Sequence, residues 1–339
     1  MKKLFPLLAG FVLALGCAAE SPSGDKGNSH GSAVDGGPKT LRIAVIPKGT
    51  THEFWRSVHA GAEQAAKEFG NVEITWKGPL QESDREGQIS LVQDFVTKRV
   101  DGICLAPLDS QALVAAVRSA KAEGIPTVIF DSALASEDDI VSYVATDNMR
   151  CGELAAETIA KMLEDRPHAK VILMRYSPGS ESTEQREEGF LNGLKRFPNV
   201  EILSSNQYTG TSFEDALSVS QQMLLKYEDQ VDGIFTVCEP NSTGMLGALQ
   251  GHAKLAGRVK FIAFDPNARL IQAMREGTVS GIVLQDPVKM GYFGVKTLVD
   301  HLNGKPVEKR VSTGEFMATQ ENMDQPEMAA LLKPAQSTD

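Results

Sequence analysis

The sequence predicts an α/β protein of two similar doubly wound parallel-sheet domains, each Rossmann-like, joined by a hinge of crossing strands with a ligand cleft between them. Short apolar runs alternate along the chain with segments whose apolar residues recur at helical spacing. Such alternation is typical of a parallel sheet with helices on both faces. The pattern occurs twice. A length of 339 residues also favours two domains, because single cores stop growing at roughly 250–300 residues.

The first half of the chain supplies one set of these elements. Leu41–Ile46 (LRIAVI) is a short apolar run, as expected of a buried parallel strand. Glu53–Phe69 carries apolar residues at helical spacing and is followed by Gly70, a common helix end. In chain order we expect strands and helices alternately at 41–46, 53–69, 72–76, 84–98, 102–105, 110–123 and 127–130, and then a final strand at 140–145.

The second half repeats this order. We expect a strand at 170–174, a helix at 184–197, a strand at 201–204 and a helix at 213–227. Three features recur in sequence at offsets of 128, 131 and 134 residues: the opening strands (Arg42 and Lys170), the motif Val-Asp-Gly-Ile (from Val100 and Val231) and the Phe-Asp pair that ends a strand (at Asp131 and Asp265). We interpret the halves as duplicated domains; chance similarity between generic βα units is the alternative.

The N-terminus predicts export from the cytoplasm. Met1–Lys3 is basic, and Leu4–Leu15 is an apolar run that is too short to span a bilayer but suits a signal peptide, which we place at residues 1–16. The run ends before Cys17 in a pattern that resembles a bacterial lipoprotein box, so we expect Cys17 to be lipidated. The alternative is an ordinary secretory signal in which Cys17 is incidental. Residues 17–38 are rich in Ser, Gly and Asp and predict a flexible tether. We therefore expect an extracytoplasmic protein of the periplasm or cell envelope.

Charge and motifs argue against several function classes. A net charge of −10 disfavours nucleic acid as a partner, because binding to phosphates requires clustered Lys and Arg. The chain has no phosphate-binding loop, no dinucleotide fingerprint and no nucleophile elbow. The histidines show no ligand spacing, so we expect neither a cofactor nor a metal. Four cysteines are too few for a disulfide scaffold, and a disulfide among Cys104, Cys151 and Cys238 stays open.

Polar side chains follow the predicted strands, where open parallel sheets bind ligands. Carboxylates and amides pair with vicinal hydroxyls, and aromatic rings cover C–H faces, so this set predicts a sugar or polyol ligand. Phe54 is as consistent with the core as with the cleft, whereas Trp55 lies off the apolar stripe and favours the cleft. An aspartate after a strand is often only a helix cap, but matched positions favour a ligand role for Asp131 and Asp265. The candidate ligand-binding residues are Lys48, His52, Phe54, Trp55, Asp131, Asn148, Glu239, Asn241, Asp265 and Gln285.

Long segments of the chain resemble the type I periplasmic binding proteins of sugar ABC importers, in the ribose/galactose-binding cluster. The resemblance runs from Leu41 to about Pro334 and rests on IAVIPKGTTHEFWRSVHAGAEQAA, VDGICLAPLDSQAL, IPTVIFDSAL, QREEGFLNGL, EPNSTGMLGAL, FIAFDPN and VLQDPVKMGYFGV. In ribose-type members the equivalents of Phe54 and Trp55 sandwich the sugar. Asp131, Asp265 and Gln285 fall on hydroxyl-binding positions.

The resemblance implies a mechanism and a set of partners. Two rigid lobes close on a hinge around the ligand, and an ABC transporter permease recognises the closed form. We expect a monomer that contacts the membrane only through its lipid anchor. The expected N-terminal lobe is 39–146 with 286–312, the expected C-terminal lobe is 147–285 with 313–335, and the hinge strands cross near 145–148, 285–287 and 311–314.

Departures from the family pattern leave the ligand open. Ribose binders carry Arg where this chain has Ser132, Asn at Ala106 and a second Arg near Glu184, so their absence disfavours ribose itself. The segments IPK at 46–48 and KGPLQESDREGQISLVQDFV at 77–96 are more similar to the autoinducer-2 and rhamnose branch, in which residues matching Lys48 and Asp131 touch the ligand. Lys48 would also permit an anionic ligand. The alternatives are a sensor for a small signal such as autoinducer-2 and, less favoured, an enzyme on a two-domain α/β scaffold.

Overall fold

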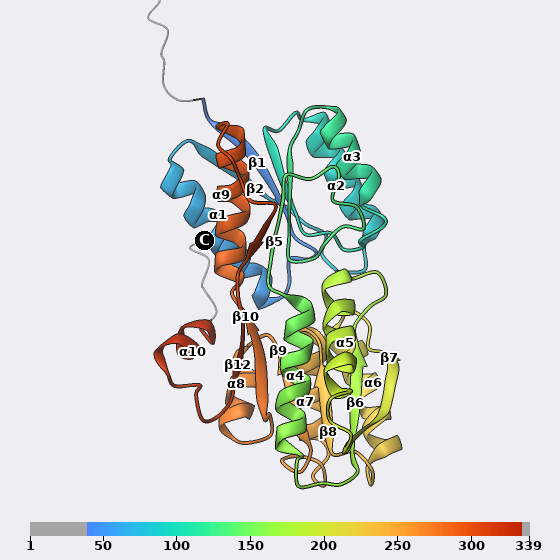
Figure 1. The fold of residues 1–339 in the computed structure, drawn as a ribbon. Coiled ribbons are helices and arrows are strands. Elements are labelled where there is room, and N and C mark those ends of the chain that lie inside the picture. The colour runs from blue at the N-terminus through green and yellow to red at the C-terminus, as the bar shows by residue number, and fades with distance from the viewer. Residues whose placement is uncertain (1–38, 334–339) are drawn as a thin grey trace, which may run out of the picture. The chain divides into compact units, whose positions relative to one another are not determined.

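Two six-stranded sheets organise residues 39–333, the part of the chain that this computed structural model describes (Figure 1). The predicted signal peptide, Cys17, the tether and residues 334–335 of the expected C-terminal lobe lie outside the described residues. The first sheet is entirely parallel and has the order β2 (Val72–Trp76), β1 (Leu41–Ile46), β3 (Gly102–Leu105), β4 (Thr127–Phe130), β5 (Ser142–Ala145), β11 (Arg310–Ser312). The second has the order β7 (Val200–Tyr208), β6 (Ala169–Arg175), β8 (Gly233–Thr236), β9 (Lys260–Phe264), β10 (Gly281–Gln285), β12 (Glu315–Ala318).

The two sheets share one strand order, which confirms the predicted fold class of two similar doubly wound domains. Each first strand pairs with the second on one side and the third on the other, and the fourth and fifth follow. The edge strands differ: β11 is parallel to β5, whereas β12 is antiparallel to β10. Such order places the carboxyl ends of the middle strands along one edge of each sheet.

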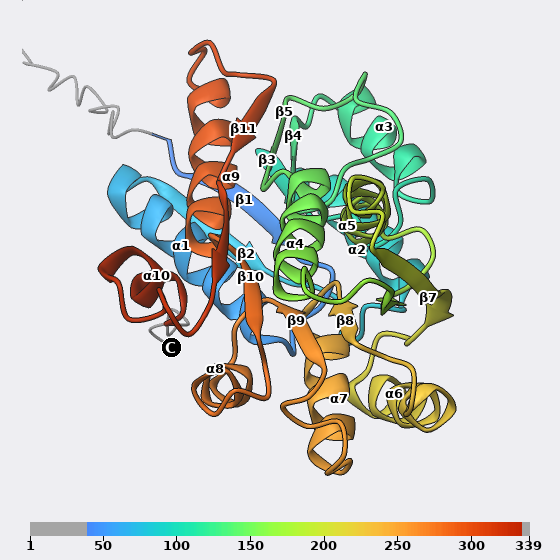
Figure 2. The same ribbon diagram turned by 60° about the horizontal axis from the view of Figure 1, so that its bottom comes forward.

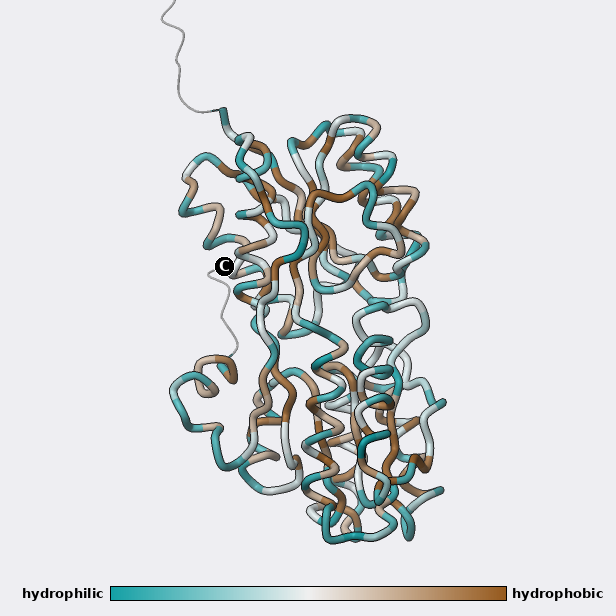
Figure 3. The backbone as a smooth tube through the Cα atoms, viewed as in Figure 1, coloured by the Kyte–Doolittle hydropathy of each residue, from teal (hydrophilic) through white to brown (hydrophobic). Residues whose placement is uncertain are grey.

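Helices cover both faces of each sheet, and apolar side chains fill the space between. In Figure 3 the inner strands are coloured as more hydrophobic than most of the surrounding chain. On the first sheet, α1 (Glu53–Phe69) and α9 (Pro287–Leu302) cover one face, and α2 (Arg85–Thr97) and α3 (Val114–Ala122) cover the other. On the second, α4 (Asn148–Met162) and α5 (Glu181–Leu194) lie opposite α6 (Phe213–Tyr227), α7 (Glu239–Gln250), α8 (Ala268–Arg275) and α10 (Pro326–Leu331). We call these two assemblies the first and the second lobe. None of the helices within residues 39–333 is long and apolar enough to cross a membrane.

Six of the predicted elements have different bounds in the structure, three of them by three residues or more at one end. The helix predicted at 110–123 starts at Val114, because the Asp109 carboxylate accepts hydrogen bonds from the N–H groups of Gln111 (3.0 Å) and Ala112 (2.9 Å) and holds a turn before it. The helix predicted at 184–197 starts at Glu181, where acidic side chains in its first turn favour the helix N-terminus. The strand predicted at 201–204 extends over 200–208 because it pairs with β6 from Val200 to Tyr208, with two shifts of register between.

The chain passes between the lobes three times: from β5 to α4, from β10 to α9 and from β11 to β12. Two of these crossings are bonded to each other. The Thr146 hydroxyl donates to the Gly314 carbonyl (2.6 Å), and the Thr313 N–H donates to the Ala145 carbonyl (3.1 Å). These two crossing segments therefore lie side by side.

Glycine permits close helix contacts in both lobes. A Cβ at Gly291 of α9 would lie 1.9 Å from the Val58 carbonyl oxygen of α1, and one at Gly189 of α5 would lie 2.1 Å from the Met149 carbonyl oxygen of α4. The helices α1 and α9 lie side by side in both views (Figure 1, Figure 2). Because any larger side chain would force the helices apart, these glycines fix how each helix pair packs.

The repeated Val-Asp-Gly-Ile motif has one structural role in both lobes. Asp101 accepts a hydrogen bond from the Arg42 N–H (2.8 Å), and Asp232 accepts one from the Lys170 N–H (2.9 Å), each at the start of the central strand. The motif therefore stabilises the amino ends of the central strands. The repeated Phe-Asp pair, by contrast, lies at the carboxyl ends of its strands, where ligands of parallel sheets bind.

Candidate functional site

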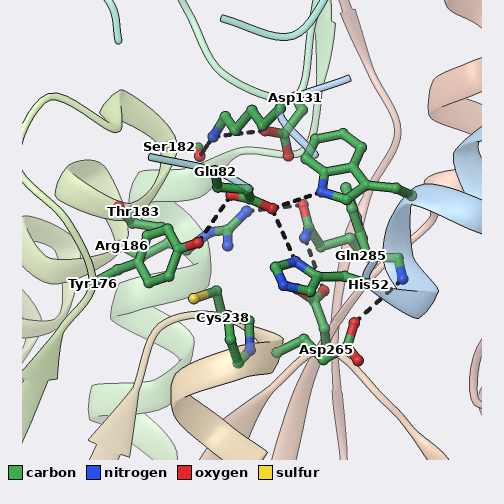
Figure 4. Close-up of a pocket in the computed structure, with 15 residues that line it drawn as sticks. His52, Glu82, Asp131, Tyr176, Ser182, Thr183, Arg186, Cys238, Asp265 and Gln285 are labelled. Atoms are coloured by element: carbon green, nitrogen blue, oxygen red, sulfur yellow. Dashed lines mark hydrogen bonds and ion pairs between the residues drawn. The ribbon is translucent and has the colours of Figure 1, made fainter. Parts of the chain in front are cut away.

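A cavity of about 30 Å³ lies where the carboxyl ends of the two sheets face each other (Figure 4). This volume is well below the roughly 300–1,000 Å³ that is usual for small-molecule sites, because the side chains of the two lobes nearly fill the space between them. Eight of the ten predicted ligand-binding residues line it: Lys48, His52, Phe54, Trp55, Asp131, Glu239, Asp265 and Gln285. The other lining residues are Glu82, Tyr176, Ser182, Thr183, Arg186, Cys238 and Pro240.

The two repeated aspartates occupy equivalent positions on opposite sides of the cavity. Asp131 follows β4 and Asp265 follows β9, with left-handed φ angles of 62° and 60°. Their N–H groups donate to the carbonyls of Val144 and Val283, both at 3.0 Å. Aspartate tolerates this backbone region better than most residues. Neither caps a helix, since Asn267 caps α8, so the helix-cap alternative is wrong for both.

Lys48 bridges the lobes at one end of the cavity. Its ammonium group forms a buried ion pair with Asp131 Oδ2 (2.9 Å) and hydrogen bonds with the hydroxyls of Ser182 (2.9 Å) and Ser180 (3.3 Å), which belong to the second lobe. An ammonium group has three donors, so these partners use all of them. Lys48 consequently holds Asp131 in place and has no donor left for an anion.

Asp265 belongs to a chain of buried polar groups in the second lobe. The side-chain amide of Gln285 donates to Asp265 Oδ1 (2.9 Å). The Arg186 guanidinium donates to Gln285 Oε1 (3.1 Å) and to Asn148 Oδ1 (2.8 Å). Burial raises the pKa of Asp265 to about 7, although the positive charge of Arg186 opposes the rise. A carboxylate in this setting gains from any ligand hydroxyl that donates to it.

Glu82 collects three donors inside the cavity. Burial would raise its pKa, but the hydrogen bond and charge of His52 outweigh burial, and the pKa is about 2. His52 Nδ1 lies 2.9 Å from Glu82 Oε1, and this contact raises the pKa of His52 against the opposing effect of its burial. Trp55 Nε1 (2.7 Å) and the Tyr176 hydroxyl (3.0 Å) also donate to the carboxylate.

Trp55 and Phe54 serve both the core and the cavity. Trp55 is 3% exposed and meets the Phe130 ring edge-on at a centroid distance of 6.3 Å. Phe54 meets Trp55 edge-on at 4.8 Å, and its N–H donates to Glu239 Oε2 of the second lobe (3.3 Å). The core and cleft alternatives are thus not exclusive for either ring.

Two of the predicted ligand-binding residues do not line the cavity. Asn148 is buried beneath it, donates to the Asp131 carbonyl (3.3 Å) and accepts from Arg186. Asn241 donates to the Met174 carbonyl (3.1 Å), and its Oδ1 accepts from the Cys238 N–H (3.0 Å) at the start of α7. Their polar atoms form hydrogen bonds with other protein groups, so both residues hold neighbouring parts of the site in place and do not contact a ligand in the cavity.

The residues that the sequence interpretation missed lie on segments that the strand-end rule also covers. Glu82 follows β2, and Tyr176, Ser182 and Thr183 follow β6, so the same reasoning applied to every strand would have found them. The expectation that no arginine lies near Glu184 is wrong. Arg186 is two residues further along α5, is 2% exposed and faces the cavity.

The thiol that lines the cavity is not a ready nucleophile. The lining thiol of Cys238 is buried, which raises its pKa well above the ordinary value and keeps it neutral. Cys104, Cys151 and Cys238 are all free and buried. Within residues 39–333 no three His, Cys, Asp or Glu side chains are grouped to hold a metal ion. Oδ1 of Asp131 and Oδ2 of Asp265 accept no hydrogen bond from the described residues. Both oxygen atoms can therefore accept a hydrogen bond from a ligand.

Comparisons with known proteins agree with this geometry. The profile of the periplasmic binding protein domain matches residues 43–306. The ribose import binding protein of Bacillus subtilis is 29% identical over 322 residues, which cover 94% of this chain and 100% of the relative. A solute-binding protein of Agrobacterium vitis solved with D-fucose is 35% identical, with a TM-score of 0.82 over 86% of this chain and 100% of that one. A carbohydrate transporter solute-binding protein of Agrobacterium radiobacter in complex with D-arabinose is 30% identical, with a TM-score of 0.82 over 86% and 99%.

Proposed function

Because the chain belongs to the periplasmic binding protein family, we propose that it is an extracytoplasmic protein that captures a sugar or polyol between its lobes and delivers it to an ABC importer. The family makes it a binding protein rather than an enzyme. Its mobile bodies are the lobes 39–146 with 286–312 and 147–285 with 313–335, which close about the crossing segments described above. The permease then recognises the closed form.

The observation that carries this proposal is the facing pair of aspartates. Asp131 and Asp265 come from opposite lobes, lie 4% and 5% exposed, and each has a carboxylate oxygen unused by the described residues. A molecule with several hydroxyls can donate to both only when the lobes are together. Hydrogen bonds to charged groups contribute about 1.5–3 kcal/mol each, so a few of them supply much of the roughly 8 kcal/mol of micromolar affinity. Trp55 and Phe54 provide apolar surface for the C–H face of the ligand.

Relatives suggest which sugars to test. Those named above bind or import ribose, D-fucose and D-arabinose. Isothermal titration calorimetry of the purified protein with D-ribose, D-arabinose, D-fucose and myo-inositol should give saturable binding of at least one, with no product formed. The double variant Asp131→Asn/Asp265→Asn should bind none, whereas Asp324→Asn, at an exposed aspartate remote from the cavity, should match the wild type. Turnover of a bound sugar, or equal binding by all three proteins, contradicts the proposal.

The same titration decides between a transport sugar and a signal molecule. The buried Lys48–Asp131 pair (2.9 Å) is the feature that the chain shares with autoinducer-2 binders, so that compound belongs in the panel. Binding of autoinducer-2 alone would make the protein a sensor.

Anchoring at Cys17 is a separate part of the proposal, supported by the apolar run and the Gly16-Cys17 pair that ends it. Cys17→Ser should move the protein from the membrane fraction to the soluble extracytoplasmic fraction and leave sugar binding unchanged. A variant that stays with the membrane contradicts lipidation at this residue.

A further inference from the structure

Glu82 lies in the loop between β2 and α2, and its side chain is 9% exposed. Three donors converge on it: Trp55 Nε1 (2.7 Å) and His52 Nδ1 (2.9 Å) meet Oε1, and the Tyr176 hydroxyl (3.0 Å) meets Oε2. A carboxylate has about four lone-pair sites, so little capacity remains for a ligand. Glu82 therefore acts on the site through the side chains that it holds.

The three donors come from both lobes. Trp55 and His52 belong to the first lobe together with Glu82, whereas Tyr176 follows β6 of the second lobe and is 2% exposed. Separation of the lobes leaves the bonds from Trp55 and His52 in place and breaks the bond from Tyr176. Figure 4 shows the phenol and the imidazole on either side of the carboxylate.

The bond between Glu82 and Tyr176 also separates the ligand cavity from a second cavity. This outer cavity, of about 190 Å³, is lined by residues of both lobes, Ser83 and Arg85 of the first and Ser177 and Pro178 of the second among them. Lys48, Glu82 and Tyr176 line both cavities. A ligand that leaves through the outer cavity must therefore pass the place where this bond forms.

We propose that Glu82 is a positioning residue that couples lobe closure to the aromatic wall of the site. Tyr176 donates to it across the cleft only in the closed state, and Glu82 in turn fixes the indole of Trp55 and the ring of His52 against the ligand. This inference rests on the proposed function, because it assigns to the bridge between Glu82 and Tyr176 the retention of the bound sugar.

The test compares three variants in stopped-flow binding to the panel sugar with the highest affinity for the wild type. Tyr176→Phe removes only the bridging hydroxyl and should raise the dissociation rate about tenfold, with the association rate changed less than twofold. Glu82→Gln should also accelerate dissociation. Because both changes remove the same bond, the double variant should raise the dissociation rate by less than the product of the two single factors. Tyr292→Phe removes a similar tyrosine–glutamate bond, to Glu68 (2.7 Å), inside the first lobe, and should match the wild type.

A readout without sugar keeps the two proposals distinguishable. In nuclear magnetic resonance spectra of the ligand-free protein, Glu82→Gln should shift the indole N–H signal of Trp55, because the bond between Trp55 and Glu82 lies within the first lobe and does not depend on closure, and should leave the signal of Trp76 unchanged. If no sugar binds to the wild type but this shift is present, the proposed function fails and the positioning role stands. An unshifted Trp55 signal, wild-type dissociation from Tyr176→Phe, or fully multiplicative effects of the two variants would overturn the inference.

Discussion

Replacing each of the two facing aspartates by asparagine should have opposite effects on stability although both changes weaken binding. Asparagine adopts the left-handed backbone of these positions as readily as aspartate does, so the change isolates the charge. Asp131 neutralises Lys48, which is 3% exposed, at 2.9 Å. Asp265 faces the neutral amide of Gln285 at 2.9 Å, and its burial raises its pKa from 3.8 to about 7.

These environments set the expected magnitudes. Removing one partner of a buried ion pair costs about 3–5 kcal/mol, and the retained amide oxygen keeps the cost of Asp131→Asn at about 3 kcal/mol. The raised pKa of Asp265 means that the folded state holds its proton more tightly than the unfolded state. Stability from this group is therefore present below pH 4 and lost as the pH rises to 7. The shift of about 3 pH units corresponds to at most about 4 kcal/mol, which Asp265→Asn should recover at pH 8.

Differential scanning calorimetry of the ligand-free protein measures both effects. For a protein of this size each kcal/mol moves the melting temperature by about 2–4 °C. At pH 8, Asp131→Asn should lower it by about 6–12 °C, whereas Asp265→Asn should raise it by several degrees. At pH 4 the second variant should match the wild type. Both variants should bind sugar at least tenfold more weakly. Equal shifts of the same sign at pH 8 would refute the reasoning.

Three further predictions concern the site and its scaffold. Sugar binding should change the fluorescence of Trp55, so Trp55→Phe should abolish the signal and Trp76→Phe, at a ring stacked on the His59 imidazole, should retain it. Affinity should rise from pH 6 to pH 8 in calorimetry, because ligand hydroxyls favour the ionised form of Asp265, and binding near pH 7 should release protons. Gly291→Ala should destabilise the protein by about 1–3 kcal/mol in urea unfolding, because the added Cβ would lie 1.9 Å from the Val58 carbonyl oxygen. Gly294→Ala is the control and should not destabilise the protein, because nothing lies within 4 Å of its added Cβ.

Each of these predictions has a contrary result. A fluorescence change that survives in Trp55→Phe would place the indole outside the ligand's reach. An affinity in Asp265→Asn that varies with pH as in the wild type would assign the pH dependence to another group, such as His52, whose pKa is also raised. Similar stabilities of the two alanine variants of α9 would show that the helix contact is not tight.

The sequence predicted the fold well because periodicity and repetition are both local signals. Strands such as Leu41–Ile46 and helices such as Glu53–Phe69 were predicted with the bounds that the structure has. The offset that pairs Asp131 with Asp265 also predicted equivalent positions, and the structure gives both the same backbone geometry. The element bounds failed where a side chain decides the turn, as at Asp109.

The site was predicted less completely, for a physical reason. Whether a polar side chain faces a ligand depends on which partners inside the protein already use its atoms. Asn148 and Asn241 lie at strand ends as expected but bind other buried groups. Glu82 and Tyr176 lie 94 residues apart, and no local pattern links them. The sequence likewise does not reveal that Lys48 is already paired, because its partners Ser180 and Ser182 come from the other lobe.

A crystal structure with the tightest-binding sugar of the panel gives the most direct test of the account. We expect the sugar inside the cavity, with hydroxyl groups donating to Asp131 and to Asp265 and with Trp55 against its C–H face. A sugar held by one lobe alone, or bound outside this cavity, would contradict the claim that the lobes grasp their ligand through these two carboxylates.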